Sequence, residues 1–443
     1  MMESQIKTHT FPDGTIQRFQ TVRLPDWEGL SFLNLKGSGN PLDCFAGIFR
    51  RYLIPACPWL FGHLVLFSLP EDAAVPFSRD TRYGSVADDL TAAAAGLRRG
   101  LRIQNGKPKF SDPETADFWH RLEEQNRIRI VSGKLPITTI IPVGNAPGLL
   151  TGTRPEAELK VNASFFIMDP FDCATVFDHV GTCLGLMVKD GVITSPPLYG
   201  REALLVRKDG AVTVEPMDIR DLPIQNGAHV YRHGQNCQVY TRPRFPYVTG
   251  TGVKLVIVGS KVAAVCRAAA PIPASGFVLC PQGDWDARPG DPVRYPALSD
   301  VAFGIQVGNS ILKDGVKTDT FRSKFYNIRH LQPVPYPPSL YPMDFRGSRA
   351  ARIALGADMD GKPMLLWAEG APKAGYVPGK HSRGASLEDL GDFCEAAGMI
   401  QAVNLDGGGS AQLLLGNRRD LEISDRTEEG IESERYVPNG LIY

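Results

Sequence analysis

Short apolar runs separated by turn residues follow one another along the chain from about residue 127 onward. Runs rich in Val, Ile and Leu and bounded by Gly, Asp or Ser are typical of β-strands. Three dipeptides between such runs predict tight hairpin turns, namely Asp190-Gly191, Asp209-Gly210 and Gly259-Ser260. The runs are IRIVSG, ITTIIPVG, AELKVNASFF, GLMVKDGVI, ALLVRKDGAVTV, NCQVYTR, VKLVIVGSKVAAVC and SGFVLC. Their succession predicts a large mixed or antiparallel system of β-sheets.

Regular patterns return after a proline-rich, irregular stretch from 281 to 350. Two strands around a turn are predicted by RAARIALGAD and GKPMLLWAEG. The following segment, SLEDLGDFCEAAG, has apolar residues at helical spacing, and its Ser386 and Asp389 resemble a capping box. A further strand, a glycine-rich turn and another strand are then predicted by MIQAVNLD, DGGGS and AQLLLG.

The first 130 residues follow a different pattern. Ser85 is expected to cap a helix over VADDLTAAAAGLRRG, and Asp112-Pro113 to open a second helix over PETADFWHRLEEQN. A buried strand is predicted by FGHLVLFSLP. We therefore predict an α+β fold with a large mixed or antiparallel β-sheet core and few helices, plus a smaller α/β N-terminal region. The expected domains are 1–130, of unknown role, and 131–443.

Composition places the chain among ordinary globular proteins. Of its 443 residues, 43% are hydrophobic and 22% are charged, and the formal net charge is zero. A zero net charge gives no electrostatic argument for nucleic acid, so we expect no such partner.

The apolar stretch Leu53–Pro70 contains three prolines and His63, which favours a buried turn and strand over a membrane span. The N-terminus lacks the apolar core of a signal peptide, so we expect a cytoplasmic protein. The oligomeric state is left open.

The residue types that commonly bind metals do not form a clear set of ligands in this sequence. The eight cysteines include no CxxC pair, and several, such as Cys266, lie inside apolar runs, which favours buried free thiols. An acidic loop follows Phe166, and it is either a metal or substrate loop or a solvent-facing segment. Its polar residues are Asp169, Asp172, Asp178 and His179. We expect neither a metal nor a cofactor.

The strongest chemical signal is QAVNLDGGGSAQLLL, in which three glycines follow a predicted strand. Successive glycines allow backbone N–H groups to approach a ligand closely and to point toward an anion such as phosphate. Asp406 adds a carboxylate at the strand end, and Ser410 adds a hydroxyl. Asn404 and Asp406 flank Leu405, so in an extended strand they lie on the same face. The structural alternative is a glycine-rich hairpin turn.

This motif, Asn404 to Ser410, resembles the most distinctive motif of the phosphodiester glycosidase family. Other segments agree in order across roughly 155 to 443: Asn162-Ala163-Ser164-Phe165-Phe166 is similar to the family's Asn-Gly-Gly-Phe-Phe, and Arg352 to Gly356 to its Arg-Thr-Ala-Ile-Gly. Ser382-Arg383-Gly384 and the closing RYVPNGLIY also match. Ala163 and Ser164 replace two glycines of the family, and added side chains there are expected to narrow or reshape the pocket.

The resemblance implies hydrolysis of a sugar–O–phosphate bond at the anomeric carbon. A phosphate leaving group needs charge stabilisation more than a strong general acid. We therefore expect Arg352 to clamp the phosphate, the amides of Gly407, Gly408 and Gly409 to cradle it, and Asp406 to activate water or stabilise the oxocarbenium-like transition state. Asn162 and Asn404 are expected to bind sugar hydroxyls or to orient Asp406. The remaining candidates for substrate binding are Ser410, Ser382 and His381.

Two alternatives stay open at this point. The chain can be a hydrolase or lyase of another glycosidic linkage, or a non-catalytic protein that binds phosphosugars or glycans. The expected ligand is a small molecule or oligosaccharide that carries a phosphodiester.

Overall fold

The computed structural model describes residues 2–35, 148–167, 181–318, 348–423 and 434–443, with short gaps at 199, 243–246, 268, 373–374 and 436. Between 36 and 147 it describes chiefly the strands β4 (Leu64–Ser68), β5 (Leu101–Gln104), β6 (Lys107–Phe110), β7 (Ile128–Val131) and β8 (Ile140–Val143). The described fold is mostly β-sheet and largely antiparallel, which confirms the predicted β-rich core. The helix expected at 86–100 lies outside the described residues, and only single residues of the one expected at 113–126 are described. The α/β character of the N-terminal region therefore stays a prediction.

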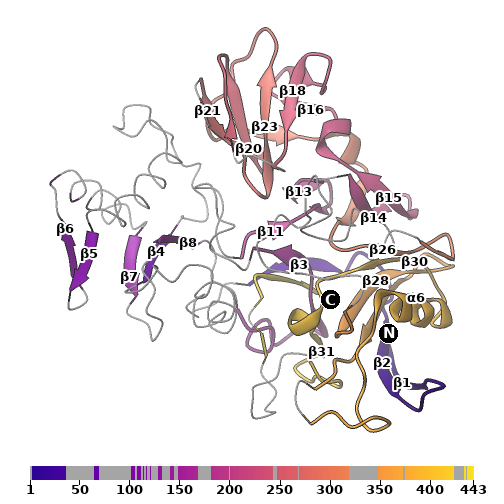
Figure 1. The fold of residues 1–443 in the computed structure, drawn as a ribbon. Coiled ribbons are helices and arrows are strands. Elements are labelled where there is room, and N and C mark those ends of the chain that lie inside the picture. Colours follow the sequence, from indigo (N-terminus) through magenta and orange to yellow (C-terminus); the bar gives the residue numbers. More distant parts are fainter. Residues whose placement is uncertain are drawn as a thin grey trace.

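A seven-stranded antiparallel sheet forms the base of the molecule (Figure 1), in the order β1-β2-β29-β28-β30-β26-β27. Every residue of β28 and β29 is buried, because other elements cover both faces of the sheet there. This explains why their sequences read as continuous apolar runs without alternation. The strands are β1 (Glu3–Thr10), β2 (Ile16–Arg23), β26 (Ser310–Lys313), β27 (Val316–Lys317), β28 (Arg352–Asp358), β29 (Pro363–Ala368) and β30 (Met399–Asn404).

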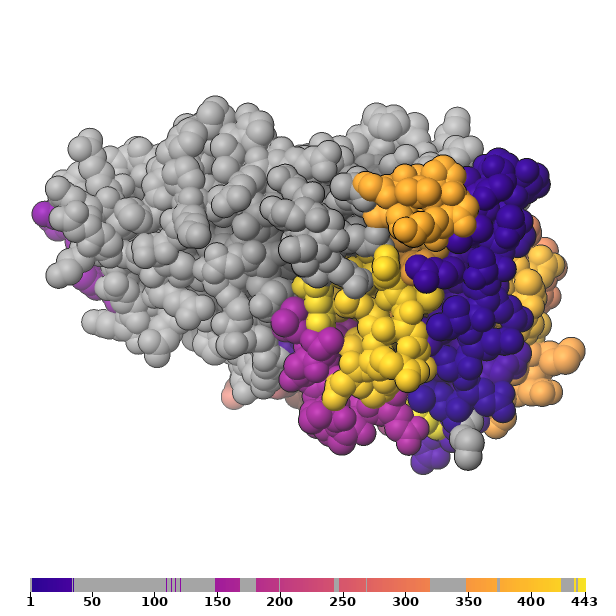
Figure 2. All heavy atoms as spheres, turned by 90° about the horizontal axis from the view of Figure 1, so that it is seen from below, coloured from indigo at the N-terminus to yellow at the C-terminus, as the bar shows by residue number. Residues whose placement is uncertain are grey.

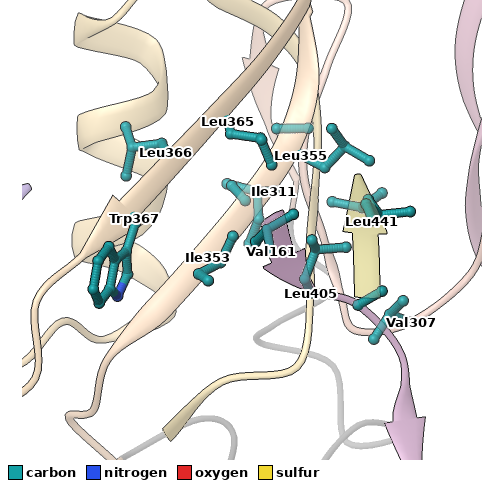
Figure 3. Packing of buried hydrophobic residues seen from close by; sticks show 14 of the residues in the cluster. Val161, Val307, Ile311, Ile353, Leu355, Leu365, Leu366, Trp367, Leu405 and Leu441 are labelled. Atoms are coloured by element: carbon teal, nitrogen blue, oxygen red, sulfur yellow. The ribbon is translucent and has the colours of Figure 1, made fainter. Parts of the chain in front are cut away.

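A four-stranded sheet packs on this base and closes the main core. Its order is β3-β32-β9-β31, with bounds Ser31–Asn34, Asn439–Ile442, Leu159–Asn162 and Leu413–Leu415. Figure 3 shows Val161 of β9 and Leu441 of β32 beside Ile353 of β28 and Leu405, the residue that follows β30; all four are fully buried. The chain therefore leaves β30 at the junction between the two sheets.

The N-terminal strands belong to the same sheet as the C-terminal ones. Residues 19 to 23 of β2 pair antiparallel with 364 to 368 of β29. The Phe19 ring stacks on Phe393 of the helix α6 (Leu387–Ala396), with 4.6 Å between ring centroids. Figure 2 shows the indigo N-terminal residues alongside the yellow C-terminal ones, and Gln20 donates to Asp420 at 3.0 Å. The boundary at 130 stays a prediction, but the first 35 residues contribute strands to the C-terminal sheets.

A third sheet, in the order β13-β12-β25-β14-β15, lies above the base (Figure 1). Its strands are Val192–Ser195, Met187–Lys189, Val301–Ile305, Arg201–Arg207 and Val212–Met217, and the short pair β10 (Phe165–Phe166) and β11 (Cys183–Leu184) precedes it. Asp190 and Gly191 both have positive φ, 51° and 77°, in the turn between β12 and β13. The predicted hairpins at 190–191, 209–210 and 259–260 are all confirmed.

Between β15 and β25 the chain builds an upper body, which shares one apolar cluster with the third sheet and has a smaller one of its own. Its largest sheet has the order β18-β23-β20-β21, visible at the top of Figure 1. The strands are β16 (Ile224–Asn226), β17 (His229–Tyr231), β18 (Cys237–Tyr240), β19 (Tyr247–Val248), β20 (Lys254–Val258), β21 (Lys261–Cys266), β22 (Ala270–Pro271), β23 (Gly276–Pro281) and β24 (Val293–Arg294).

Local chemistry at the C-terminal helix follows the sequence prediction. Ser386 caps α6, and the side chains of Ser386 and Asp389 bond reciprocally to each other's backbone amides.

Among the described residues, the cysteines Cys183, Cys237, Cys266, Cys280 and Cys394 are free thiols. No helix in the described part of the chain is long and apolar enough to cross a membrane.

Replacing Phe19 with Ala tests whether β2 is part of the main core. Phe19 is 6% exposed, and removing a buried aromatic side chain costs about 3–5 kcal/mol. Ile6→Ala on the exposed strand β1, where Ile6 is 46% exposed, is the control and should cost less than about 1 kcal/mol. Urea unfolding measures both. An equally small loss for Phe19→Ala would mean that β2 lies outside the cooperative core.

Candidate active site

Asp406 lies where the two sheets of the main core meet. The amide of Leu405 donates to the carbonyl of Ile353 at 2.8 Å, which continues the pairing of β30 with β28. One residue later, the amide of Asp406 donates instead to the carbonyl of Ala163, just after β9, at 3.0 Å. Leu405 is buried in the core, and Asp406 is half-buried. The change of backbone partner fixes Asp406 at the edge of both sheets.

Three glycines then turn the chain through a short 3-10 helix, η7 (Gly408–Ser410). Gly408 has φ of 63°, a left-handed conformation that favours glycine. A Cβ atom at Gly407 would lie 3.0 Å from the carbonyl oxygen of Ala351 and 3.4 Å from Cδ of Arg352. Gly407 is therefore needed because the turn passes close to the start of β28.

The expected cradle of three amides is wrong for Gly408. Its amide donates to the carbonyl of Ala351 at 2.8 Å, so this N–H is used to hold the turn on β28. The amide of Gly407 donates to the Asp406 carboxylate. Glycines were expected here for ligand contact, but two of the three amides serve the fold and Asp406 itself, which leaves Gly409 as the candidate for a ligand.

The Asp406 carboxyl group has an unusual environment. Burial raises its pKa to about 7, although the Ser410 hydroxyl, Arg435, the Gly407 amide and Arg352 all act to lower it. A carboxyl group that changes its protonation state near neutral pH can exchange protons with a substrate or a water molecule. Ser410 is itself buried, so its hydrogen bond also fixes the direction of the carboxylate.

Arg352 is brought to this turn as expected. It begins β28 and is 4% exposed. One of its terminal nitrogens donates to the carbonyl oxygen of Ser348 at 2.9 Å and to the Ser348 hydroxyl at 3.0 Å, and its Nε donates to the carbonyl of Ala385 at 3.4 Å. These bonds hold the guanidinium group beside Gly407 and within electrostatic reach of Asp406.

Asn162 supports the Asp406 turn through the backbone. Its Nδ2 donates to the Asp406 carbonyl at 2.7 Å, and its Oδ1 accepts from the Gln412 amide at 2.8 Å. The side chain is 1% exposed. Because both ends of the amide bond to the backbone on either side of the glycine turn, the geometry favours an orienting role over contact with sugar hydroxyls.

Asn404 is buried away from the surface of the site. It is 1% exposed and packs under Gly308, where a Cβ atom would lie 2.5 Å from Nδ2 of Asn404. Neither Nδ2 nor Oδ1 has a hydrogen-bond partner among the described residues. The structure therefore gives no exposed surface of this amide that a substrate could contact.

The hydrogen bonds of Ser382 and His381 lead elsewhere. The Ser382 hydroxyl donates to the Glu369 carboxylate and accepts from the Arg18 amide at 2.9 Å, so it joins β2 to the chain after β29. Nδ1 of His381 accepts from the amide of Val377 at 3.0 Å. None of these three bonds leads to Asp406.

The two residues that replace the family's glycines are packed inside the protein. Ala163 is fully buried in the main core. Ser164 is 2% exposed; its hydroxyl donates to Met187 Sδ at 3.2 Å and accepts from Asn439 Nδ2 at 2.8 Å. The added atoms are accommodated by β12 and β32, so the expected narrowing of the pocket finds no support in these two side chains.

Three residues near the site were not identified from the sequence: Ser348, Gln412 and Arg435. Arg435 lies in the closing segment that resembles the family, and that resemblance was the available signal. Ser348 and Gln412 act through hydrogen bonds to the chain, which no sequence pattern reveals. The acidic residues Asp169, Asp172, Asp178 and His179 lie outside the described residues.

Two solved structures resemble the whole chain at low similarity. A hypothetical protein from Synechocystis is 15% identical, with a TM-score of 0.42, and the match covers 100% of this chain and 61% of that one. The zebrafish N-acetylglucosamine-1-phosphodiester alpha-N-acetylglucosaminidase catalytic domain, auto-inhibited by its pro-peptide, is 13% identical, with a TM-score of 0.37; the match covers 100% of this chain and 82% of that one.

The sequence comparisons are more specific. No curated protein matches the chain. Residues 281–443 match the family model described as phosphodiester glycosidase. This region contains Arg352, the motif from Asn404 to Ser410, and Arg435. The match confirms, for residues 281–443, the resemblance seen in the sequence, and it points to a glycosidase-type hydrolase.

Proposed function

We propose that this protein hydrolyses glycosyl phosphodiesters by cleaving the bond between the anomeric carbon and the phosphate oxygen. The main support for the proposal is the Asp406 carboxyl group, which lies within electrostatic reach of two arginines, Arg352 and Arg435, in the matched domain. A carboxylate suits the anomeric centre, where positive charge develops, and guanidinium groups suit the phosphate.

The charges of the reaction fit this arrangement. A phosphodiester carries one negative charge, whereas the phosphomonoester that leaves gains a second one above its second pKa of about 6. Negative charge therefore grows on the phosphate as the carbon–oxygen bond breaks. Cations beside the phosphate stabilise the transition state more than the bound substrate, which is the condition for a faster chemical step.

Asp406 acts in its ionised form in this proposal. It takes a proton from the water molecule that attacks the anomeric carbon, while the electron pair of the broken bond stays on the phosphate oxygen. The products are the free sugar and a phosphomonoester dianion, and the proton then leaves Asp406 for solvent. Asn162 and Ser410 contribute by holding the backbone and the carboxylate of Asp406.

Turnover by wild type and by Asp406→Asn tests the proposal. We expect the wild type to hydrolyse at least one member of a panel of glycosyl-1-phosphodiesters and nucleotide sugars. The measurement is the release of sugar and phosphomonoester. Removing the base should lower kcat by about 10²–10⁴-fold with a small change in KM. Asp392→Asn, on the exposed side of α6, is the matched control and should keep wild-type rates.

Two outcomes would contradict this account of Asp406. A wild type that turns over no panel member, with a mutant that binds the ligands equally well, would indicate a binding protein. Turnover of aryl glycosides alone would indicate a different glycosidic linkage.

The pH dependence separates the roles of Asp406. Because burial raises the pKa of Asp406 to about 7, the ionised base is lost as pH falls below this value. With Asp406 as base, kcat/KM falls about tenfold per pH unit below about 7 and is level above about 8. A rate that instead rises as pH falls through this range would make Asp406 the general acid.

Stability gives an independent measurement of the same pKa. The folded state binds the Asp406 proton more tightly than the unfolded state, so this group's contribution to the free energy of unfolding falls as pH rises from about 4 to about 7. Asp406→Asn lacks this decline and should gain stability relative to the wild type over that range. Urea unfolding at several pH values checks it, and parallel curves would mean that the pKa of Asp406 is ordinary.

A further inference from the structure

Glu369 places a buried carboxylate directly after β29. The residue is 1% exposed. Its carboxylate accepts hydrogen bonds from Nε of Arg18 at 2.7 Å, from the amide of Glu422 at 3.0 Å and from the Ser382 hydroxyl. Burial of a charge is costly even when polar partners surround it, and apolar side chains of similar size often join two strands with less cost. We therefore looked for a role of this network beyond packing.

Ser382 connects the carboxylate to the N-terminal strand β2. Its hydroxyl donates to Glu369 and accepts from the amide of Arg18 at 2.9 Å. The following amide, that of Arg383, donates to the carbonyl of Ile16 at 3.0 Å. Residues 382–385, here called the clip, are thus attached to β2 through their first two residues.

The other end of the clip reaches the start of β28. The amide of Ala385 donates to the carbonyl of Ala350 at 2.8 Å, and its carbonyl accepts from the amide of Ala350 at 3.2 Å. The same carbonyl accepts Nε of Arg352 at 3.4 Å. Gly384 has φ of 77°, and a Cβ atom there would lie 3.0 Å from the nitrogen of Ala350, so this close approach requires glycine. The clip therefore contacts the guanidinium group of Arg352 directly.

The sheet provides a second connection between the network and Arg352. Arg352 pairs with Ala368 of β29, which is the residue before Glu369. The amide of Glu369 in turn donates to the carbonyl of Arg18 at 3.0 Å. The side chain of Arg352 lies beside the glycine turn, since a Cβ atom at Gly407 would be 3.6 Å from its Nη1. A shift of the clip would therefore move a cation of the active site.

We propose that Ser382, Glu369 and Arg18 are positioning residues for Arg352. They act through the clip, which sets the direction of the guanidinium group, and they do not touch the substrate. Strand β2 lies outside the matched residues 281–443, so the N-terminal strand is a working part of the active site. This inference rests on the proposed function, in which Arg352 stabilises the phosphate.

Double-mutant cycles with the full chain test the coupling, on the phosphodiester of the panel that the wild type hydrolyses fastest. We expect Arg352→Ala to lower kcat/KM about 100-fold. Ser382→Ala and Arg18→Gln should each lower it about tenfold, chiefly through kcat, because a displaced cation loses contact with the transition state. In the Arg352→Ala background the same two changes should cost less than about twofold, whereas a purely structural role gives losses that multiply.

Arg23→Gln is the matched control for Arg18→Gln. Both arginines lie on β2, with side chains 43% and 37% exposed, and Arg23 pairs with Asp358 at the opposite end of β28 from Arg352. We expect this variant to keep kcat/KM within about twofold of the wild type. Urea unfolding checks that each variant is folded. Because Arg18 is partly exposed, Arg18→Gln keeps the test valid if Ser382→Ala does not fold.

Binding of inorganic phosphate and of methyl phosphate, measured by calorimetry, repeats the cycles without turnover. Ser382→Ala and Arg18→Gln should each weaken binding at least about threefold, and should leave it unchanged in the Arg352→Ala background. Losses that multiply in both measurements, or wild-type behaviour of the folded variants, would overturn the positioning role.

The same data separate this inference from the proposed function. A coupled loss of phosphate binding in a protein that hydrolyses no phosphodiester would refute the proposed function and keep the positioning role. Wild-type rates and phosphate binding in Arg352→Ala would refute both.

Discussion

The position of Asp406 depends on one amide side chain that joins the two sheets of the main core. Asn162, at the end of β9, bonds to the backbone on both sides of the glycine turn, at Asp406 and at Gln412. These bonds replace the sheet pairing that β30 loses where it ends. Without them, the segment that carries Asp406 would be held by backbone bonds alone, among them those of Asp406 to Ala163 and of Gly408 to Ala351. The carboxylate is held in place by a buried network, as a preorganised site requires.

Burial at this junction has a cost that the function explains. A carboxylate without full hydration is destabilised, and for this reason the pKa of Asp406 is raised to about 7 in spite of two arginines and two hydrogen-bond donors. A structural carboxylate is usually paired so that its pKa falls, as for Asp389, where the bonds to Ser386 and Arg349 outweigh the effect of burial. The raised pKa of Asp406 contrasts with the lowered pKa of Asp389, which serves a helix cap, and this contrast supports the proposed catalytic role of Asp406.

Features governed by local chemistry could be predicted from the sequence, and features governed by long-range pairing could not. The turn at Asp190-Gly191 and the capping box of Ser386 depend on a few adjacent residues, and both are confirmed. The pairing of β2 with β29 joins residues more than three hundred positions apart, and no local pattern indicates it. Ser382 shows the same limit, because a serine two residues before a glycine resembles a ligand-binding residue until its partner, Glu369, is known. The glycines were expected to allow the close approach of a ligand, whereas the atoms nearest Gly407 in this structure belong to Ala351 and Arg352, and the Gly408 amide is bonded to Ala351.

In the proposed reaction the bond to the anomeric carbon is cleaved, with Asp406 at carbon and the two arginines at phosphate. Hydrolysis of a glycosyl phosphodiester in ¹⁸O-labelled water tests this directly, with mass spectrometry of the phosphomonoester product. Attack at carbon predicts a phosphomonoester without ¹⁸O, because the phosphate keeps the original bridging oxygen. Label in the phosphomonoester would mean that water attacks phosphorus, and it would contradict the assignment of Asp406 to the anomeric centre.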